Sequence, residues 1–426
     1  MKKLKNYSLL VMGMLAFNIA NAQTVNSFTV QQAADYAKKN SVQVKNALLD
    51  ILIQKQTNRD ITSIALPQIG GSASVNDYLQ IPTTLLPGQI VGQPVGTYVP
   101  VKFGTKWNAS AGVSLSQIVF DGQVFIALKA RNGTITYQEQ IAKLTEESII
   151  ANVHKVYYQL VTGKIQIELL DANISRLEKL KRDVQIMYDN GFTEKVDIDK
   201  LAVQLANLQT EKLKANNLIA NGYAGLKMLM GMPVKDSLVL TDTLDDNKIR
   251  EGVLEASQYK YTDRKEFQII ETANKLNGLN VRRYKLSAIP SFALVGNYAL
   301  QAQRSKFDFF GKGDWFSTSY IGLQMHVPIF NGFALKARTQ KARLELQKTQ
   351  NQTEALKINI DAEVETAKNN FVAAIASMDF QKKNMVLAEK VYGQTKKKYE
   401  IGTGSATEIN TAQLDLKTAQ TNYITA

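Results

Sequence analysis

Two stretches of the chain alternate apolar and polar residues with a period of two, the spacing of a β-strand that has two different faces. They cover 67–121 and 290–331, and each is interrupted near its middle by a segment without such alternation. The interruption at 82–106 is rich in proline and glycine, and the one at 302–314 is shorter. Each stretch therefore predicts two strands joined by a long loop, which is a β-hairpin.

Outside these stretches the apolar residues recur every three or four positions, which predicts helices. The longest helices would span roughly 100 Å at 1.5 Å per residue. The apolar positions from Ile167 to Val184 follow a heptad-like spacing, which favours packing as a coiled coil. The predicted helices cover 27–65, 123–188, 198–230, 263–288, 334–400 and 409–423.

The order helix, hairpin, long helix, turn, helix occurs twice along the chain. We therefore expect an internal duplication, with a first repeat at 23–233, a polar link at 234–262 and a second repeat at 263–426. The final helix is expected to be truncated relative to its counterpart, which continues to Met230. Similar residues stand at corresponding places of the two repeats: Leu66-Pro67 and Ile289-Pro290, Trp107 and Trp315, Phe120-Asp121-Gly122 and Phe330-Asn331-Gly332, Gly191 and Gly402, Asp197 and Glu408.

Each repeat contains a tight turn between two helices, at 189–194 and at 400–405. The second turn follows three lysines, and a helix C-terminus favours cations. Gly402 and Gly404 are expected to adopt positive φ, which costs glycine little, and Ser405 or Thr407 is expected to cap the outgoing helix. The residues predicted to form the two tips are Gly191, Phe192, Gly402, Thr403 and Gly404.

Residues 1–22 have the pattern of a secretory signal peptide, with lysines first, an apolar run next and the small-x-small sequence Ala-Asn-Ala before Gln23. A membrane anchor is the less favoured alternative, because the apolar run is too short to cross a bilayer comfortably. Removal of three signal-peptide lysines lowers the net charge from +13 to near +10. The remaining lysines are interleaved with acids, which is typical of solvated helix faces, and a nucleic-acid partner is not expected.

The residue types of metal and catalytic sites are sparse. The chain has no cysteine, so an exported form has to be held by packing or oligomerisation. His154 lies within a predicted helix and His326 within a predicted strand, without metal-ligand spacing. The Gly-x-Gly at Gly402 does not follow a strand, as a nucleotide loop would. We therefore expect no enzyme, no cofactor and no metal site.

Four strands of about a dozen residues suit a bilayer crossing, but they cannot close a barrel alone, and an open sheet edge cannot face lipid. Three chains would supply twelve strands, enough for a barrel with an open lumen. Polar strand residues would then line water, and Trp107 and Trp315 would lie in an interfacial aromatic belt. A soluble antiparallel sheet with one solvated face has the same alternation and is the alternative.

The acids after the two turns allow two interpretations. If the helices continue the barrel as a tube, Asp197 and Glu408 could form rings of carboxylates at its far mouth, favouring cations and narrowing the opening. They are equally consistent with ordinary first-turn acids that the helix dipole stabilises.

Both turns have the pattern Tyr-x-x-Gly followed by an acid at the next helix start, and the second hairpin ends at the junction Pro328-Ile329-Phe330-Asn331-Gly332. Through these residues the whole mature chain resembles the TolC-like outer-membrane efflux proteins. The resemblance implies an α+β membrane protein: a homotrimer with a twelve-stranded β-barrel, four strands per chain, continued by a long α-helical coiled-coil barrel. In the family, acids near the second tip constrict the aperture; Glu408 matches that position, whereas Thr411 stands where a second acid is expected.

The resemblance also implies a function. It predicts an exit duct in the cell outer membrane with a periplasmic extension, serving a tripartite efflux or type I secretion system. The implied partners are a periplasmic adaptor (membrane fusion protein) docked at the hairpin tips, an inner-membrane pump and outer-membrane lipid. The rival interpretation is a soluble periplasmic coiled-coil scaffold, which would be extracted without detergent.

Overall fold

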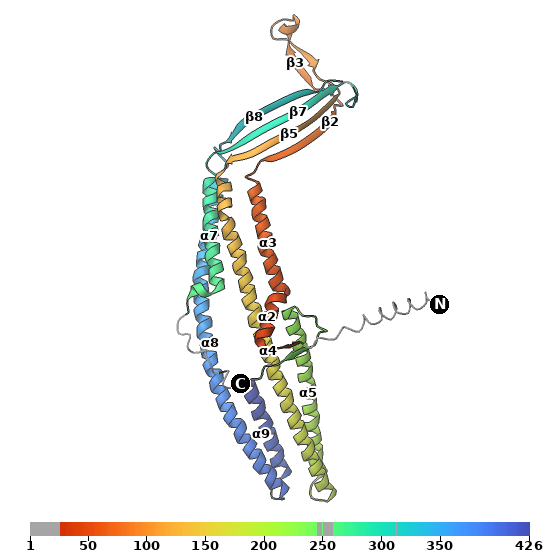
Figure 1. Ribbon diagram of the computed structural model, residues 1–426, viewed down its shortest axis with the longest axis vertical. Helices are drawn as coiled ribbons and strands as arrows, with labels where there is room; N and C mark the ends of the chain where they lie inside the picture. The colour runs from red at the N-terminus through yellow and green to blue at the C-terminus, as the bar shows by residue number, and fades with distance from the viewer. Residues whose placement is uncertain (1–25, 245–248, 250–258, 312) are drawn as a thin grey trace, which may run out of the picture. The chain divides into compact units, whose positions relative to one another are not determined.

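The computed structural model describes residues 26–244, 249, 259–311 and 313–426 (Figure 1). The expected signal peptide at 1–22 lies outside the described residues, as does most of the later part of the expected link. The chain divides into two compact units, which we call the helical unit (Met1–Leu49, Glu139–Gln268 and Glu354–Ala426) and the sheet unit (Asp50–Gln138 and Ile269–Thr353). Each unit takes segments from both expected repeats, so the compact units do not follow the repeat boundaries.

The sheet unit contains a four-stranded antiparallel sheet. Its strands are β2 (Gln68–Asp77), β5 (Trp107–Phe120), β7 (Ser291–Arg304) and β8 (Phe316–His326), in the spatial order β2-β5-β7-β8. The two outer strands, β2 and β8, each have one edge that pairs with no other strand in the described part of the chain. The central β5–β7 pair joins the two alternating stretches into one sheet.

The register places apolar and polar residues on opposite faces across all four strands. One row contains Ile69, Leu115, Gly296 and Ile321, and a row on the other face contains Asn76, Asn108 and Gln303. On the polar face, the hydroxyls of Ser74 and Ser110 lie 2.9 Å apart across β2 and β5. The alternation in the sequence therefore produces one continuous apolar face rather than four unrelated patches.

Helices and loops meet opposite ends of the sheet within the sheet unit. The last turns of α3 (Val42–Ser63) and α7 (Lys265–Leu286) and the first turns of α4 (Gly122–Asp189) and α8 (Ala334–Glu400) connect at one end, where Gln68 pairs with Ser116 and Ser291 with His326. The long β2–β5 and β7–β8 connections leave from the other end (Figure 1).

The segment expected as a plain loop at 82–106 contains a second small hairpin. Strands β3 (Thr83–Pro87) and β4 (Tyr98–Lys102) pair antiparallel around the short 3-10 helix η1 (Gly88–Val91). The density of proline and glycine hides this pairing in the sequence, because a two-stranded ribbon tolerates proline along its edges.

The helix expected over 27–65 is divided in the structure. The strand β1 (Asn26–Phe28) precedes α2 (Val30–Asn40), and Ser41 separates α2 from α3 with extended ψ of 131°. Gly231 lies against this break so closely that a Cβ there would stand 2.3 Å from the Asn40 carbonyl oxygen. Thr29 is the N-cap of α2, since its hydroxyl accepts from the Gln32 N–H in a capping box.

The helical unit also contains α5 (Lys195–Met230), α9 (Ala406–Thr425), the strand β6 (Leu238–Leu240), and η2 (Tyr261–Asp263). β6 pairs parallel with β1, so the start of the expected link is structured. One core cluster of this unit centres on Tyr157, which is fully buried and whose hydroxyl donates to the Phe28 carbonyl at 2.8 Å. None of the helices in the described ranges is apolar over a length sufficient to cross a membrane.

Candidate functional site

The turn between α4 and α5 ends its first helix in a left-handed glycine. Gly191 has φ of 82°, and its N–H donates to the Tyr188 carbonyl at 2.9 Å. The next N–H, of Phe192, donates to the Met187 carbonyl at 2.9 Å, and the Phe192 side chain is 79% exposed. This pattern satisfies the last carbonyls of α4 and leaves an apolar ring exposed in the turn.

The turn between α8 and α9 repeats the same hydrogen bonds. Gly402 has φ of 75° and donates to the Tyr399 carbonyl at 3.0 Å, while Thr403 donates to the Lys398 carbonyl at 3.0 Å. The expected positive φ at Gly404 is wrong, because Gly404 has no left-handed φ. Its backbone instead packs onto the helix end, where a Cβ would lie 3.0 Å from the Tyr399 nitrogen.

Glu408 lies in the first turn of α9 and takes part in its cap. The Ser405 hydroxyl accepts from the Glu408 N–H at 3.2 Å, and the Glu408 carboxylate accepts from the Ser405 N–H at 3.4 Å. Ser405, rather than Thr407, is therefore the N-cap. The Glu408 side chain remains exposed, so its charge faces solvent while one oxygen serves the cap.

Asp197 occupies the corresponding place in α5 but is held differently. The N-cap residue there is Glu194, whose side chain makes no capping hydrogen bond. Instead the Thr193 hydroxyl donates to the Asp197 carboxylate at 2.9 Å, and Lys200 lies 3.4 Å away on the other oxygen. The Asp197 side chain is only 17% exposed, so it is more enclosed than Glu408.

Tyr399 connects the two tips within the helical unit. Its ring is 5% exposed and belongs to a core cluster with Ile198 and Leu201 of α5. Burial, and next the charges of Asp197 and Asp183, raise the pKa of the Tyr399 hydroxyl above its usual value. Within the described residues this hydroxyl has no hydrogen-bond partner. The second tip is thus anchored in the first through an aromatic ring.

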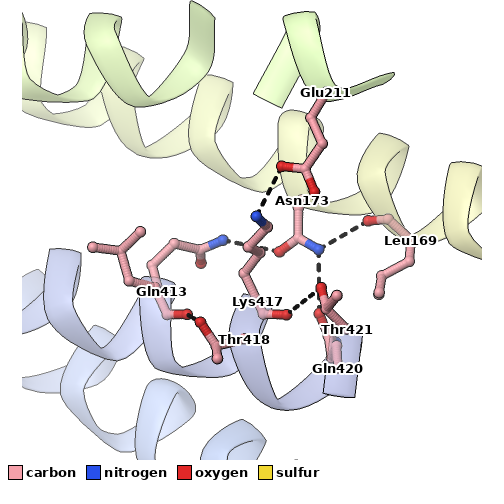
Figure 2. Close-up of polar contacts among 9 residues, drawn as sticks. Leu169, Asn173, Glu211, Gln413, Lys417, Thr418, Gln420 and Thr421 are labelled. Carbon is pink, nitrogen blue, oxygen red and sulfur yellow. Dashed lines mark hydrogen bonds and ion pairs between the residues drawn. The ribbon is translucent and has the colours of Figure 1, made fainter. Parts of the chain in front are cut away.

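A layer of buried amides lies behind the tips, between α4 and α9 (Figure 2). Asn173 is fully buried. Its Nδ2 donates to the Leu169 carbonyl at 2.9 Å and to the Gln420 side-chain oxygen at 3.2 Å. Its Oδ1 accepts from the Gln413 side-chain nitrogen at 3.2 Å. Beside it, Lys417 of α9 pairs with Glu211 of α5 at 2.8 Å. Sequence reasoning missed this layer, although amides interrupting an apolar seam were a signal for it.

The two tryptophans lie at the loop end of the sheet. The Trp107 ring is 5.1 Å from Phe307 in an edge-on contact, and Trp315 is 6.3 Å from Phe309. Phe309 and Trp107 pack on Ala109 and Ala302, which belong to the apolar face. The structure thus gathers aromatic rings at the boundary of that face.

No group of three or more His, Cys, Asp or Glu side chains with the spacing of a metal site occurs in the described part of the chain. The features that stand out are the helical tips and a sheet with one apolar face.

Comparison with known proteins agrees with this geometry. A protein family described as "Outer membrane efflux protein" matches residues 280–426. "Outer membrane protein TolC" of Vibrio cholerae is 18% identical over 322 residues, which cover 74% of this chain and 73% of that protein. The crystal structure of the Campylobacter jejuni CmeC outer membrane channel has a TM-score of 0.73 at 17% identity, covering 93% of this chain and 82% of that one.

The expected resemblance to the TolC-like outer-membrane efflux proteins is confirmed by the matched family and by the shared fold, and so is the expected outer-membrane location. A "probable efflux pump outer membrane protein TtgC" of Pseudomonas putida is 20% identical over 242 residues. This match spans 57% of this chain and about half (49%) of that relative.

Proposed function

We propose that three copies of this chain form an outer-membrane exit duct that passes substrates from an inner-membrane pump across the periplasm and outer membrane. The observation that carries the proposal is the four-stranded sheet, which has one continuous apolar face and, among the described residues, two outer edges without a partner strand. Unpaired edges are costly in lipid, and three copies would join β2 to β8 into a closed barrel of twelve strands. Strands of 10 to 14 residues suit such a crossing.

The apolar face would meet the bilayer and the polar face the lumen. Ile321 is 74% exposed and Leu323 is 66% exposed in the single chain, which is costly in water and favourable in lipid. Trp107 and Trp315 would then lie at one bilayer interface, where aromatic rings are enriched. This arrangement supports the membrane duct over the soluble periplasmic scaffold, which would leave the apolar face exposed to water.

The helices would continue the barrel as a coiled-coil tube, and the paired tips would form its inner mouth. Glu408 and Asp197 are proposed as the acids of this aperture, with the exposed Glu408 contributing more of the charge that a passing ion meets. The tip residues Gly191, Phe192, Gly402, Thr403 and Gly404 are proposed to dock the periplasmic adaptor. The local roles of both acids in capping their helices are compatible with this function.

The two repeats predicted from the sequence are also part of the proposed duct. The repeated hydrogen bonds at Gly191 and Gly402 support an internal duplication, in which each repeat supplies one hairpin of the sheet and one helical tip. Efflux is preferred over type I secretion because the TtgC relative is described as part of an efflux pump.

Two adjacent substitutions on β8 test the membrane orientation. Ile321→Lys would place a charge on the proposed lipid face, at a cost of about 2–4 kcal/mol near the bilayer centre. Tyr320→Lys, on the opposite face, is the matched control. We expect Ile321→Lys to reduce the trimer extracted by detergent from membranes, and Tyr320→Lys to leave the yield unchanged and conduct ions in planar bilayers. Equal yields for both variants, or a wild-type protein extracted without detergent, would favour the soluble scaffold.

A further inference from the structure

A cavity of about 240 Å³ lies in the sheet unit among α3, α4 and α7. Two arginines line it, Arg131 of α4 and Arg283 of α7, and both side chains are half-buried. The remaining lining is apolar or neutral, with Ile61, Ile126 and Leu276 among its members. No aspartate or glutamate lines the cavity.

Arg131 is held by neutral partners only. Its Nη1 donates to the Thr62 hydroxyl at 2.7 Å, and its Nε donates to the Leu128 carbonyl at 3.0 Å. The surrounding turn is fixed by Asn58, which is 6% exposed and donates to the Arg131 carbonyl at 2.8 Å. Arg131 is therefore positioned by its neighbours while its charge stays unneutralised.

The buried Nε of Arg283 has no hydrogen-bond partner among the residues that the structure describes, and its guanidinium lies 4.8 Å from the centre of the Tyr284 ring. Neither arginine has a carboxylate within ion-pair distance in the described ranges. Two half-buried cations without a counter-ion are unfavourable, and an anion with several oxygens would satisfy both. Each guanidinium can donate two parallel N–H hydrogen bonds to two oxygens of the same phosphate, so two arginines together bind phosphate well.

The position of the cavity suggests which phosphate occupies it. Arg283 lies three residues before the end of α7, and Arg131 lies nine residues into α4, at the helical end of the sheet. At 1.5 Å per residue their Cα atoms are about 5 and 14 Å from the ends of their helices, and the headgroup layer on each side of the hydrocarbon core is roughly 5–8 Å deep. The Arg131 side chain points back toward the start of α4, because its Nε donates to the Leu128 carbonyl. Its guanidinium therefore lies nearer to that layer than its Cα does. The apolar lining residues would accompany the start of an acyl chain.

The geometry points to a phospholipid site: Arg131 and Arg283 bind the phosphate of a headgroup in the periplasmic leaflet of the outer membrane. This assignment rests on the proposed membrane-spanning orientation of the sheet. The two arginines alone would also suit a free phosphate ion. The experiment below distinguishes a lipid headgroup from free phosphate.

The test is native mass spectrometry of the detergent-extracted full chain with three probes: phosphatidylglycerol, diacylglycerol with the same acyl chains, and glycerol 3-phosphate. We expect phosphatidylglycerol to bind and diacylglycerol not to bind. Arg131→Gln and Arg283→Gln should each weaken phosphatidylglycerol binding about tenfold, the loss that follows when one hydrogen bond to a charged group is removed. Arg282→Gln, at an exposed neighbour on the same helix, is the matched control and should bind like the wild type.

Three results would overturn the assignment. Glycerol 3-phosphate bound as tightly as phosphatidylglycerol would identify a site for free phosphate. Unchanged lipid binding in the double Arg131→Gln/Arg283→Gln variant would place the lipid elsewhere. Equal weakening by Arg282→Gln would indicate general charge attraction. Conductance of the same preparations is recorded in a separate measurement. A protein that binds lipid through the two arginines but does not conduct ions would contradict the proposed function and leave the lipid site intact.

Discussion

Tyr399 of the second tip is buried beside Asp197 of the first, and this carboxylate is one of the groups that raise the pKa of its hydroxyl. The corresponding residue of the first tip, Tyr188, is 39% exposed. Two tyrosines in the same local turn therefore differ in what surrounds them. The buried one holds the tips together, and the exposed one does not.

Removing the ring tests this difference. Tyr399→Ala should destabilise the paired tips by about 3 kcal/mol, because a large buried ring is lost, and should raise conductance. Tyr188→Ala is the control and should change either quantity much less. Tyr399→Phe keeps the ring and should retain the wild-type stability. Hydrogen exchange of the tip amides measures the effect, and equal exchange in the two alanine variants would contradict the anchoring role.

The same tyrosine predicts a dependence on pH. Because the pKa of Tyr399 is raised in the folded chain, its contribution is present below the unfolded value near 10 and is lost as the pH rises through the folded value. Hydrogen exchange of the tips should therefore accelerate at alkaline pH in the wild type, and less in Tyr399→Phe. An identical alkaline response in both proteins would assign it to other groups.

Glu408 has a capping role and a proposed aperture role that can be separated. Glu408→Gln keeps an oxygen for the Ser405 N–H but removes the charge, whereas Glu408→Ala removes both. We expect both variants to reduce cation selectivity in planar bilayers, and only Glu408→Ala to lower stability, by about 1 kcal/mol. Asp60→Asn, at an exposed acid of α3, is the control. Unchanged selectivity in Glu408→Gln would leave the residue with the capping role alone.

The backbone conformation at position 402, rather than a lack of room for a side chain, requires glycine. No atom lies within 4 Å of a Cβ built there, yet its φ is 75°. Gly402→Ala should therefore cost about 1 kcal/mol through strain alone. Gly393, within α8, also has open space around a Cβ but no positive φ, and Gly393→Ala should stabilise the helix by about 0.5–1 kcal/mol. Thermal unfolding in detergent compares the two, and a shared sign would contradict the explanation.

The amide layer around Asn173 should be costly to disrupt from one side. Asn173→Ala leaves the amides of Gln413 and Gln420 without this partner, and we expect a loss of about 1–3 kcal/mol. Replacing both Asn173 and Gln413 by leucine should recover part of this loss, because no polar group of the pair remains buried. Asn216→Ala, at an exposed position of α5, is the control for the loss of an asparagine from a helix.

The chain has only two tryptophans, so fluorescence can locate the proposed interface. Trp107→Phe and Trp315→Phe each leave a single emitter, and lipids brominated near the headgroup should quench both. Lipids brominated deep in the acyl chain should quench them less. Stronger quenching by the deep bromines, or none by either lipid, would contradict the interfacial position.

The periodicity of the sequence determined the strands and most of the helix ends, because these depend on local rules. Alternation with period two defined the strands of the sheet, and left-handed glycines ended helices at Gly191 and Gly402. The sequence left the cap open between Ser405 and Thr407, and the capping box at Ser405 needs only this residue and Glu408. Such features need only short-range hydrogen bonds and the conformational freedom of glycine.

Only the tertiary structure decided the contacts between distant segments. The break at Ser41 accompanies the close approach of Gly231, which no local pattern near 41 records. Local sequence does not distinguish Tyr188 from Tyr399, because burial depends on which helices pack around each ring. Helix packing also brings Asn173 into contact with Gln413, and it places Arg131 and Arg283 in the lining of one cavity. Packing between segments far apart in the chain, rather than local propensity, brings these side chains together.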